Sequence, residues 1–66
     1  MNWAEAKEAF VLNRIVGYKG GRYWINALCN RRIDGIITTQ VVLGDMNGNS
    51  EIVVKEEFME EILDAE

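Results

Sequence analysis

Three pairs of turn-forming residues interrupt the apolar middle of this chain, and they constrain its fold more than any other feature. The pairs are Gly20-Gly21, Asp34-Gly35 and Asn47-Gly48, each flanked by β-branched or aromatic residues. Glycine, asparagine and aspartate tolerate the positive φ angles that two-residue hairpin turns require. The spacing therefore predicts a meander of four antiparallel strands. We expect these strands at about residues 14–19, 22–32, 36–43 and 50–55.

The predicted meander has apolar residues on both faces of its sheet. One face is expected to carry Val16, Tyr18, Tyr23, Ile25, Ala27, Val42 and Val53. The other is expected to carry Trp24, Leu28, Val41, Leu43, Ile52 and Val54. A sheet with one solvated face alternates more clearly between apolar and polar residues, so both faces are expected to need a cover. The uncharged stretch 36–44 is expected to be central, because an open edge of this composition favours aggregation.

The N-terminus has the spacing of a capped amphipathic helix. Asn2 and Glu5 form a capping-box pattern, which predicts a helix over residues 2–12. Trp3, Ala6 and Phe10 lie on one side of this helix, and large aromatic side chains in such a stripe are typical of a core. We therefore expect the helix to cover one face of the sheet.

The acidic C-terminal segment completes the predicted fold. Apolar residues recur there one helical turn apart, which predicts a short helix over residues 56–64. The chain, residues 1–66, is expected to be one α+β domain. It combines an N-terminal helix, a four-stranded antiparallel meander curled as a small SH3-like barrel, and a short C-terminal helix. Such a small domain buries only about 60% of its unfolded surface. Because 48% of the residues are hydrophobic, we expect homo-oligomerisation or another protein partner.

The residue types that carry most enzyme chemistry are scarce. The chain has no histidine, and Cys29 is its single cysteine, so no disulfide, metal framework or nucleophile–base pair is evident. We therefore expect no enzyme activity, no catalytic or metal-binding residue and no cofactor. A lone cysteine fits a reducing compartment. No signal-peptide pattern and no apolar run of about 18 residues is visible, so we expect a cytoplasmic protein without a membrane partner.

The charges divide the chain into two halves of opposite sign. Five basic residues and no acid lie between Ala9 and Ile33, whereas eight acids and only Lys55 lie from Asp45 onward. Two interpretations are open. The basic hairpin binds a ligand, or it pairs with the acidic C-terminal helix within the monomer or across a dimer.

A cluster of basic and aromatic residues is the candidate partner-binding site. Its members are Tyr18, Arg22, Trp24, Arg31 and Arg32. The leading hypothesis is a non-catalytic interaction module that presents this cluster to an acidic protein partner and self-associates through apolar sheet surface. The alternative is that the first hairpin binds single-stranded nucleic acid or a nucleotide, with rings stacking on bases and cations on phosphates. The net charge of −4 argues against tight, non-specific duplex binding.

A lesser alternative is calcium binding at residues 45–56. Oxygen-bearing side chains stand at loop positions 1, 3, 5 and 12 of this segment, and Ile52 stands at position 8, as in an EF-hand loop. Position 6, which requires glycine, is Ser50, and the segment before the loop is β-branched. A hairpin turn followed by a helix explains the same residues.

Three runs of the sequence support a resemblance. They are residues 16–28, 40–45 and 49–54, with the patterns VGYKGGRYWINAL, QVVLGD and NSEIVV. Together they resemble short uncharacterised proteins of phages and mobile elements of Gram-positive bacteria, in which a helix precedes a small SH3-like β-meander. The resemblance implies an accessory protein that acts by occupying the surface of a host or viral protein. It implies no site residues, and Thr38 and Thr39 stand here where an aromatic residue is common.

Overall fold

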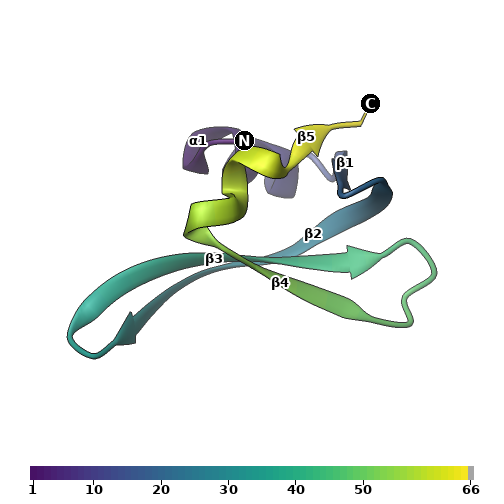
Figure 1. Cartoon of the computed structure of the whole chain (residues 1–66). Helices are drawn as coiled ribbons and strands as arrows, with labels where there is room; N and C mark the ends of the chain where they lie inside the picture. The colour runs from purple at the N-terminus through teal and green to yellow at the C-terminus, as the bar shows by residue number, and fades with distance from the viewer. Residues whose placement is uncertain (66) are drawn as a thin grey trace.

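The computed structural model describes residues 1–65 and has one α-helix, one 3-10 helix and a five-stranded antiparallel sheet (Figure 1). The elements are α1 (Trp3–Val11), β1 (Ile15–Tyr18), β2 (Gly21–Ile33), β3 (Ile36–Asp45), β4 (Glu51–Lys55), η1 (Glu56–Glu61) and β5 (Leu63–Asp64). The predicted α+β class is therefore confirmed. The strand order across the sheet is β4-β3-β2-β1-β5.

Helix α1 begins and ends through local side-chain and backbone chemistry. The Asn2 side chain accepts a hydrogen bond from the Glu5 N–H at 2.8 Å, and the Asn2 N–H donates to the Glu5 carboxylate at 3.0 Å. Asn13 adopts a left-handed conformation with φ 55°, and the Arg14 N–H then donates to the Ala9 carbonyl at 2.9 Å. The capping box predicted from the sequence is thus present, and the helix ends in a Schellman-type turn.

The helix packs on the sheet through alanines rather than aromatic residues. Ala6 and Ala9 are almost fully buried, whereas Trp3 and Phe10 remain 38% and 39% exposed. The expectation that Trp3 and Phe10 belong to the core is therefore wrong. Small side chains let the helix backbone approach the sheet closely, and this leaves the larger rings at the margin of the contact.

The first hairpin turns one residue earlier than predicted. Lys19 and Gly20 form the turn with φ 48° and 81°, and Tyr18 pairs with Gly21. Positive φ at both central residues is the geometry of a type I′ turn, which fits the twist of the flanking strands. Consequently Val16 lies opposite Tyr23, two residues from the register expected from a Gly20-Gly21 turn.

The other two hairpins have the predicted register. Asp34 and Gly35 form a turn with φ 52° and 78°, and β2 pairs with β3 from that turn to the middle of the sheet. Strands β3 and β4 pair with Leu43 opposite Ile52, as the Asn47-Gly48 motif predicts. The turn residues therefore determined these registers locally.

Strand β2 contains a β-bulge at Asn26. Ile25 pairs with Leu43 and Ala27 pairs with Val42, so Asn26 has no partner residue on β3. An extra residue in one strand bends that strand and reverses the alternation of its side chains. The bulge was not predicted, and it changes which residues share a face.

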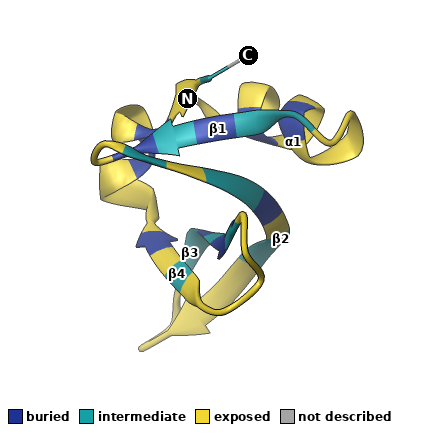
Figure 2. Ribbon diagram, turned by 90° about the vertical axis from the view of Figure 1, so that its right-hand side faces the viewer, coloured by how far each residue is buried: buried dark blue, intermediate teal, exposed yellow. Residues whose placement is uncertain are grey.

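The bulge combines half of each predicted face into one core. The buried core consists of Ala6, Ala9, Val16, Tyr18, Ile25, Val41, Leu43, Val54, Met59 and Ile62. Figure 2 shows the sheet bent at β2 into a C shape with α1 beside β1. Figure 1 shows α1, η1 and β5 on one side of β2, β3 and β4. Residues 1–65 therefore cover one face of these strands and not both.

The sheet does not close into the predicted SH3-like barrel. Strands β4 and β5 stand at opposite ends of the strand order and are not hydrogen-bonded to each other. The prediction of a C-terminal helix over residues 56–64 is also wrong. This segment forms a 3-10 helix to Glu61, followed by an extended residue and the short strand β5, which pairs with β1.

The buried residues of this segment differ from the predicted helical stripe. Met59 and Ile62 are buried, whereas Phe58 is 41% exposed and Leu63 is 64% exposed. Ile62 lies directly after η1 in an extended conformation, so burial of Met59 and Ile62 against the core fixes this segment without a continuous helical stripe. The Met1 ammonium group also donates to the carbonyls of Met59 and Ile62 at 2.8 and 2.6 Å, which ties this segment to the N-terminus.

Candidate partner-binding surface

One face of the sheet lies away from α1 and η1, and we call it the outer face. Side chains alternate along a strand, so the residues next to a core residue in the sequence point to the outer face. Residues that are paired across neighbouring strands then form rows on that face. Ala27, Val42 and Val53 form one row across β2, β3 and β4, and Cys29, Gln40 and Lys55 form the next. Arg22 and Trp24 lie on the same face in the first part of β2, and Arg31 lies opposite Thr38 further along.

The middle of the outer face is apolar and accessible. Val53 is 55% exposed, and Trp24, Ala27 and Val42 are half-buried. None of these four residues belongs to the core or packs against it. An apolar strip with a polar border is a common feature of interaction surfaces.

The charged border of this face is mostly basic. Arg22 and Arg31 are exposed, and within residues 1–65 neither forms an ion pair. The ion pair found in this part of the chain joins Arg14 to Asp64 at 3.4 Å. Glu51 is the acidic residue among the outer rows, and its carboxylate accepts a hydrogen bond from the Asn26 side chain at 3.0 Å. Within residues 1–65, the ion pair between the basic half and the acidic tail is therefore that of Arg14.

The structure places three of the five predicted site residues on one face, with Arg22 and Arg31 near opposite ends of β2. Arg22, Trp24 and Arg31 share the outer face. Tyr18 lies in the core with 8% of its surface exposed, so its ring offers no surface to a partner. Arg32 is opposite Ile37, on the other face from its neighbour Arg31. Sequence reasoning separated Trp24 from Ala27, Val42 and Val53, because the bulge that unites them has no clear signature.

The aromatic residues of the first hairpin do not form one stacking platform. Tyr18 is buried and Tyr23 packs against the core, whereas Trp24 points to the outer face. The Lys19 Nζ lies 5.5 Å from the centre of the Tyr18 ring, so the cation covers part of that ring. The arrangement therefore offers a nucleic acid one outward-facing ring rather than the predicted cluster.

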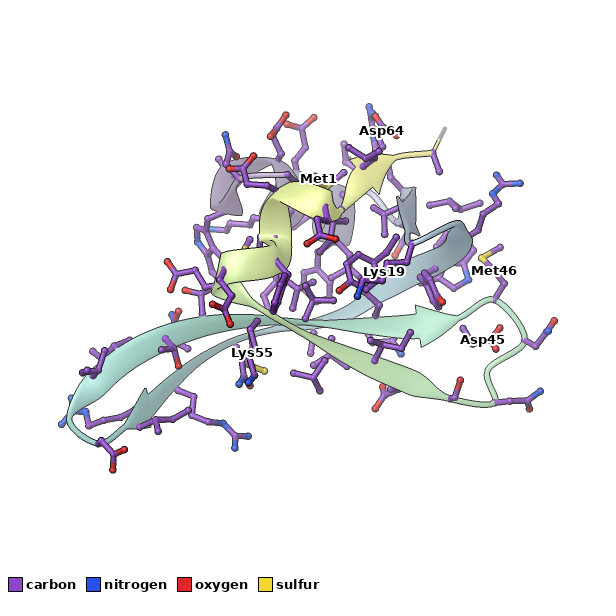
Figure 3. All side chains as sticks on the ribbon, in the orientation of Figure 1. Met1, Lys19, Asp45, Met46, Lys55 and Asp64 are labelled. Carbon is purple, nitrogen blue, oxygen red and sulfur yellow. The ribbon has the colours of Figure 1, made fainter. Side chains whose placement is uncertain are left out.

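The segment with an EF-hand-like pattern does not gather its predicted ligands. Asp45 begins a tight turn in which its carboxylate accepts from the Asn47 N–H at 2.8 Å. Glu56, at loop position 12, follows strand β4, and Figure 3 shows Asp45 and Lys55 near opposite ends of that strand. Five extended residues span roughly 17 Å, too far for both carboxylates to bind one ion. Within residues 1–65, no group of three acidic, cysteine or histidine residues could hold a metal ion.

Comparisons with protein-family models, curated proteins and solved structures find no match to this chain. The resemblance to phage and mobile-element proteins therefore stays a prediction. Over the described part of the chain, neither helix has the length and apolar character needed to span a lipid bilayer.

Proposed function

We propose that this protein is a non-catalytic interaction module that binds an acidic protein partner through the outer face of its sheet. The observation that carries the proposal is the position of Arg22, Trp24 and Arg31 on one uncovered face, beside exposed Val53. Tryptophan and arginine are the residue types most enriched among those that dominate binding energy. This face therefore combines an apolar centre with donors for carboxylates.

The chemistry of the face defines the partner. Arginine forms bidentate hydrogen bonds with carboxylates, and the two exposed arginines border the apolar strip. A complementary surface has an apolar side chain at its centre and acidic side chains at its margin. The chain carries a net charge of −4, so attraction to such a partner depends on this local basic surface rather than on total charge.

The neighbouring residues Arg31 and Arg32 provide a matched experiment. Reversal of either charge to glutamate changes the net charge equally, but only Arg31 points to the outer face. Affinity capture from the native host, with quantification of each captured protein, compares Arg31→Glu with Arg32→Glu. We expect Arg31→Glu to reduce capture of the partner by roughly tenfold or more, as for other arginines at binding hot spots, and Arg32→Glu to leave capture nearly unchanged.

Three results contradict the proposal. Equal losses with both variants indicate a general charge effect. Retention of the partner by Arg31→Glu and by a second outer-face variant, Trp24→Ala, removes this face from binding. Quenching of tryptophan fluorescence by single-stranded oligonucleotides at low salt, lost as salt is raised, favours nucleic-acid binding instead.

A further inference from the structure

Strand β3 has an open edge next to the end of β4. Strand β4 pairs with β3 only from Gln40 to Gly44, so no strand lies beside residues 36–39 on that side. Alternate residues of an antiparallel strand direct their N–H and C=O groups to the same side. The Thr39 N–H reaches the Glu56 carboxylate across this edge at 3.5 Å, so Ile37, two residues earlier, also directs its backbone groups outward.

A groove accompanies the open edge. It has a volume of about 610 Å³ and is lined by residues of the β2–β3 hairpin tip, of β3 and of the β4–η1 junction, including Ile33, Ile36, Lys55, Glu56 and Glu57. The apolar side chains at the tip are unusually accessible, because Ile36 and Ile37 are 66% and 61% exposed. The groove therefore offers both backbone hydrogen-bonding groups and apolar surface to an incoming strand.

The sequence lacks the usual devices that block an open edge. Natural edge strands carry charges, prolines or bulges that prevent strand addition. Residues 36–39 contain no charged residue, the chain has no proline, and the bulge of this sheet lies on β2. The Glu56 carboxylate covers this edge only at Thr39, whose N–H donates a hydrogen bond to it. An unprotected edge beside an apolar groove is the arrangement used when an extended segment adds to a sheet.

We propose that the occupant of this groove is the same edge of a second copy, so that two β3 strands pair antiparallel across a two-fold axis at Ile37. A two-fold contact brings identical surfaces together, and here each copy offers exposed isoleucines to the isoleucines of the other. Lys55 already occupies the place opposite Gln40, which limits the overlap to residues 36–38. This register places Ile37 opposite Ile37 of the second copy.

The charges agree with this pairing. Each groove carries Glu56 and Glu57 beside a single Lys55. Each hairpin carries Arg31 and Arg32, for which residues 1–65 provide no ion pair, and Asp34 at its tip offsets one of these two positive charges. Antiparallel pairing directs the tip of each hairpin toward the β4–η1 junction of the other, so basic and acidic residues approach across the axis. The overlap is short, so the contact is small and the dimer forms reversibly.

Sedimentation velocity from the low micromolar to the millimolar range measures this association. We expect the wild-type protein to change from monomer to dimer across that range. Ile37→Pro removes the outward backbone N–H. Ile37→Val keeps this N–H and has a side chain of similar size. We expect Ile37→Pro to weaken association by roughly tenfold or more and Ile37→Val to preserve it. Circular dichroism of dilute samples checks that both variants remain folded.

A charge exchange tests the register and does not depend on the proline variant. Ile37→Lys and Ile37→Glu place like charges opposite each other in their own dimers, so each variant alone is expected to be monomeric. An equimolar mixture is expected to recover the dimer. A wild-type protein that stays monomeric, equal association of the proline and valine variants, or a mixture that stays monomeric would overturn the proposal. The Ile37 variants leave Arg22, Trp24 and Arg31 unchanged, so failure of this test and failure of the proposed partner binding are distinguishable.

Discussion

Replacement of Gly44 by alanine tests the bulge that decides which residues form the core. Gly44 lies opposite Trp24, and the Asn26 side chain crosses directly above it on its way to Glu51. A Cβ atom at Gly44 would lie 2.7 Å from the Asn26 Cγ and 2.8 Å from its Oδ1. Gly44 does not have a positive φ, so alanine brings no backbone strain there. The cost of the substitution comes from this one side chain.

The expected change in the free energy of unfolding combines three contributions. Overlap with Asn26 costs about 1 kcal/mol, at the low end for overpacking, because the Asn26 side chain is exposed and can rotate away. Rotation breaks the Asn26–Glu51 hydrogen bond, which removes about 0.5–1 kcal/mol. Alanine restores about 0.5–1 kcal/mol through the lower entropy of its unfolded chain. The net destabilisation is about 1 kcal/mol, equivalent to a fall in Tm of about 4–8 °C.

A double-mutant cycle makes this prediction specific to the bulge. Asn26→Ala removes each of the atoms that the new Cβ would meet. In that background Gly44→Ala is expected to stabilise the protein by about 0.5–1 kcal/mol. The coupling between the two sites is then about 1.5–2 kcal/mol. Urea unfolding followed by circular dichroism measures all four proteins without relying on the fluorescence of Trp24.

A coupling near zero would refute this reasoning, because Asn26 would then not lie across Gly44. The same result would remove the evidence that Asn26 is the extra residue of the bulge. If the Asn26→Ala protein binds its partner normally, partner binding by the outer face does not need the packing of Asn26 on Gly44.

Two further predictions concern the core and the helix cap. Leu43→Ala is expected to cost about 3 kcal/mol, since Leu43 is fully buried, whereas Val53→Ala on the outer face is expected to change stability by less than about 0.5 kcal/mol; thermal unfolding that ranks them equally would contradict the assignment of the faces. Asn2→Ala is expected to cost about 1 kcal/mol through loss of the capping box, and Asn2→Ser is expected to retain most of the stability in the same assay.

The proposed dimer and the proposed partner surface are centred on different parts of the sheet, and Arg31 lies near both. The outer face is centred on Val42 and Val53, whereas the open edge lies at residues 36–39. A module of this type could therefore bind one partner through each copy of a dimer. Two linked binding sites increase the apparent affinity for a partner that is itself repeated, without any new contact.

The sequence predicted the features whose causes are local. The Asn2 capping box and the Asp34-Gly35 turn each depend on residues within a few positions of one another. The order of the first four strands and the two later registers follow from the turns alone. For the same reason Arg22 and Trp24 could be selected from the sequence as candidates, because they stand close together in one strand.

The tertiary structure decided where the two faces lie and what covers them. The bulge at Asn26 moves Ile25 to the same face as Val41. The residue types around Asn26 fit a regular strand as well as they fit a bulge. The 3-10 helix η1 and strand β5 depend on burial of Met59 and Ile62 against distant residues rather than on helix propensity. Local chemistry sets turns and caps within a few residues. Which side of a strand becomes the core is set by contacts between elements far apart in the chain, and those contacts exist only after folding.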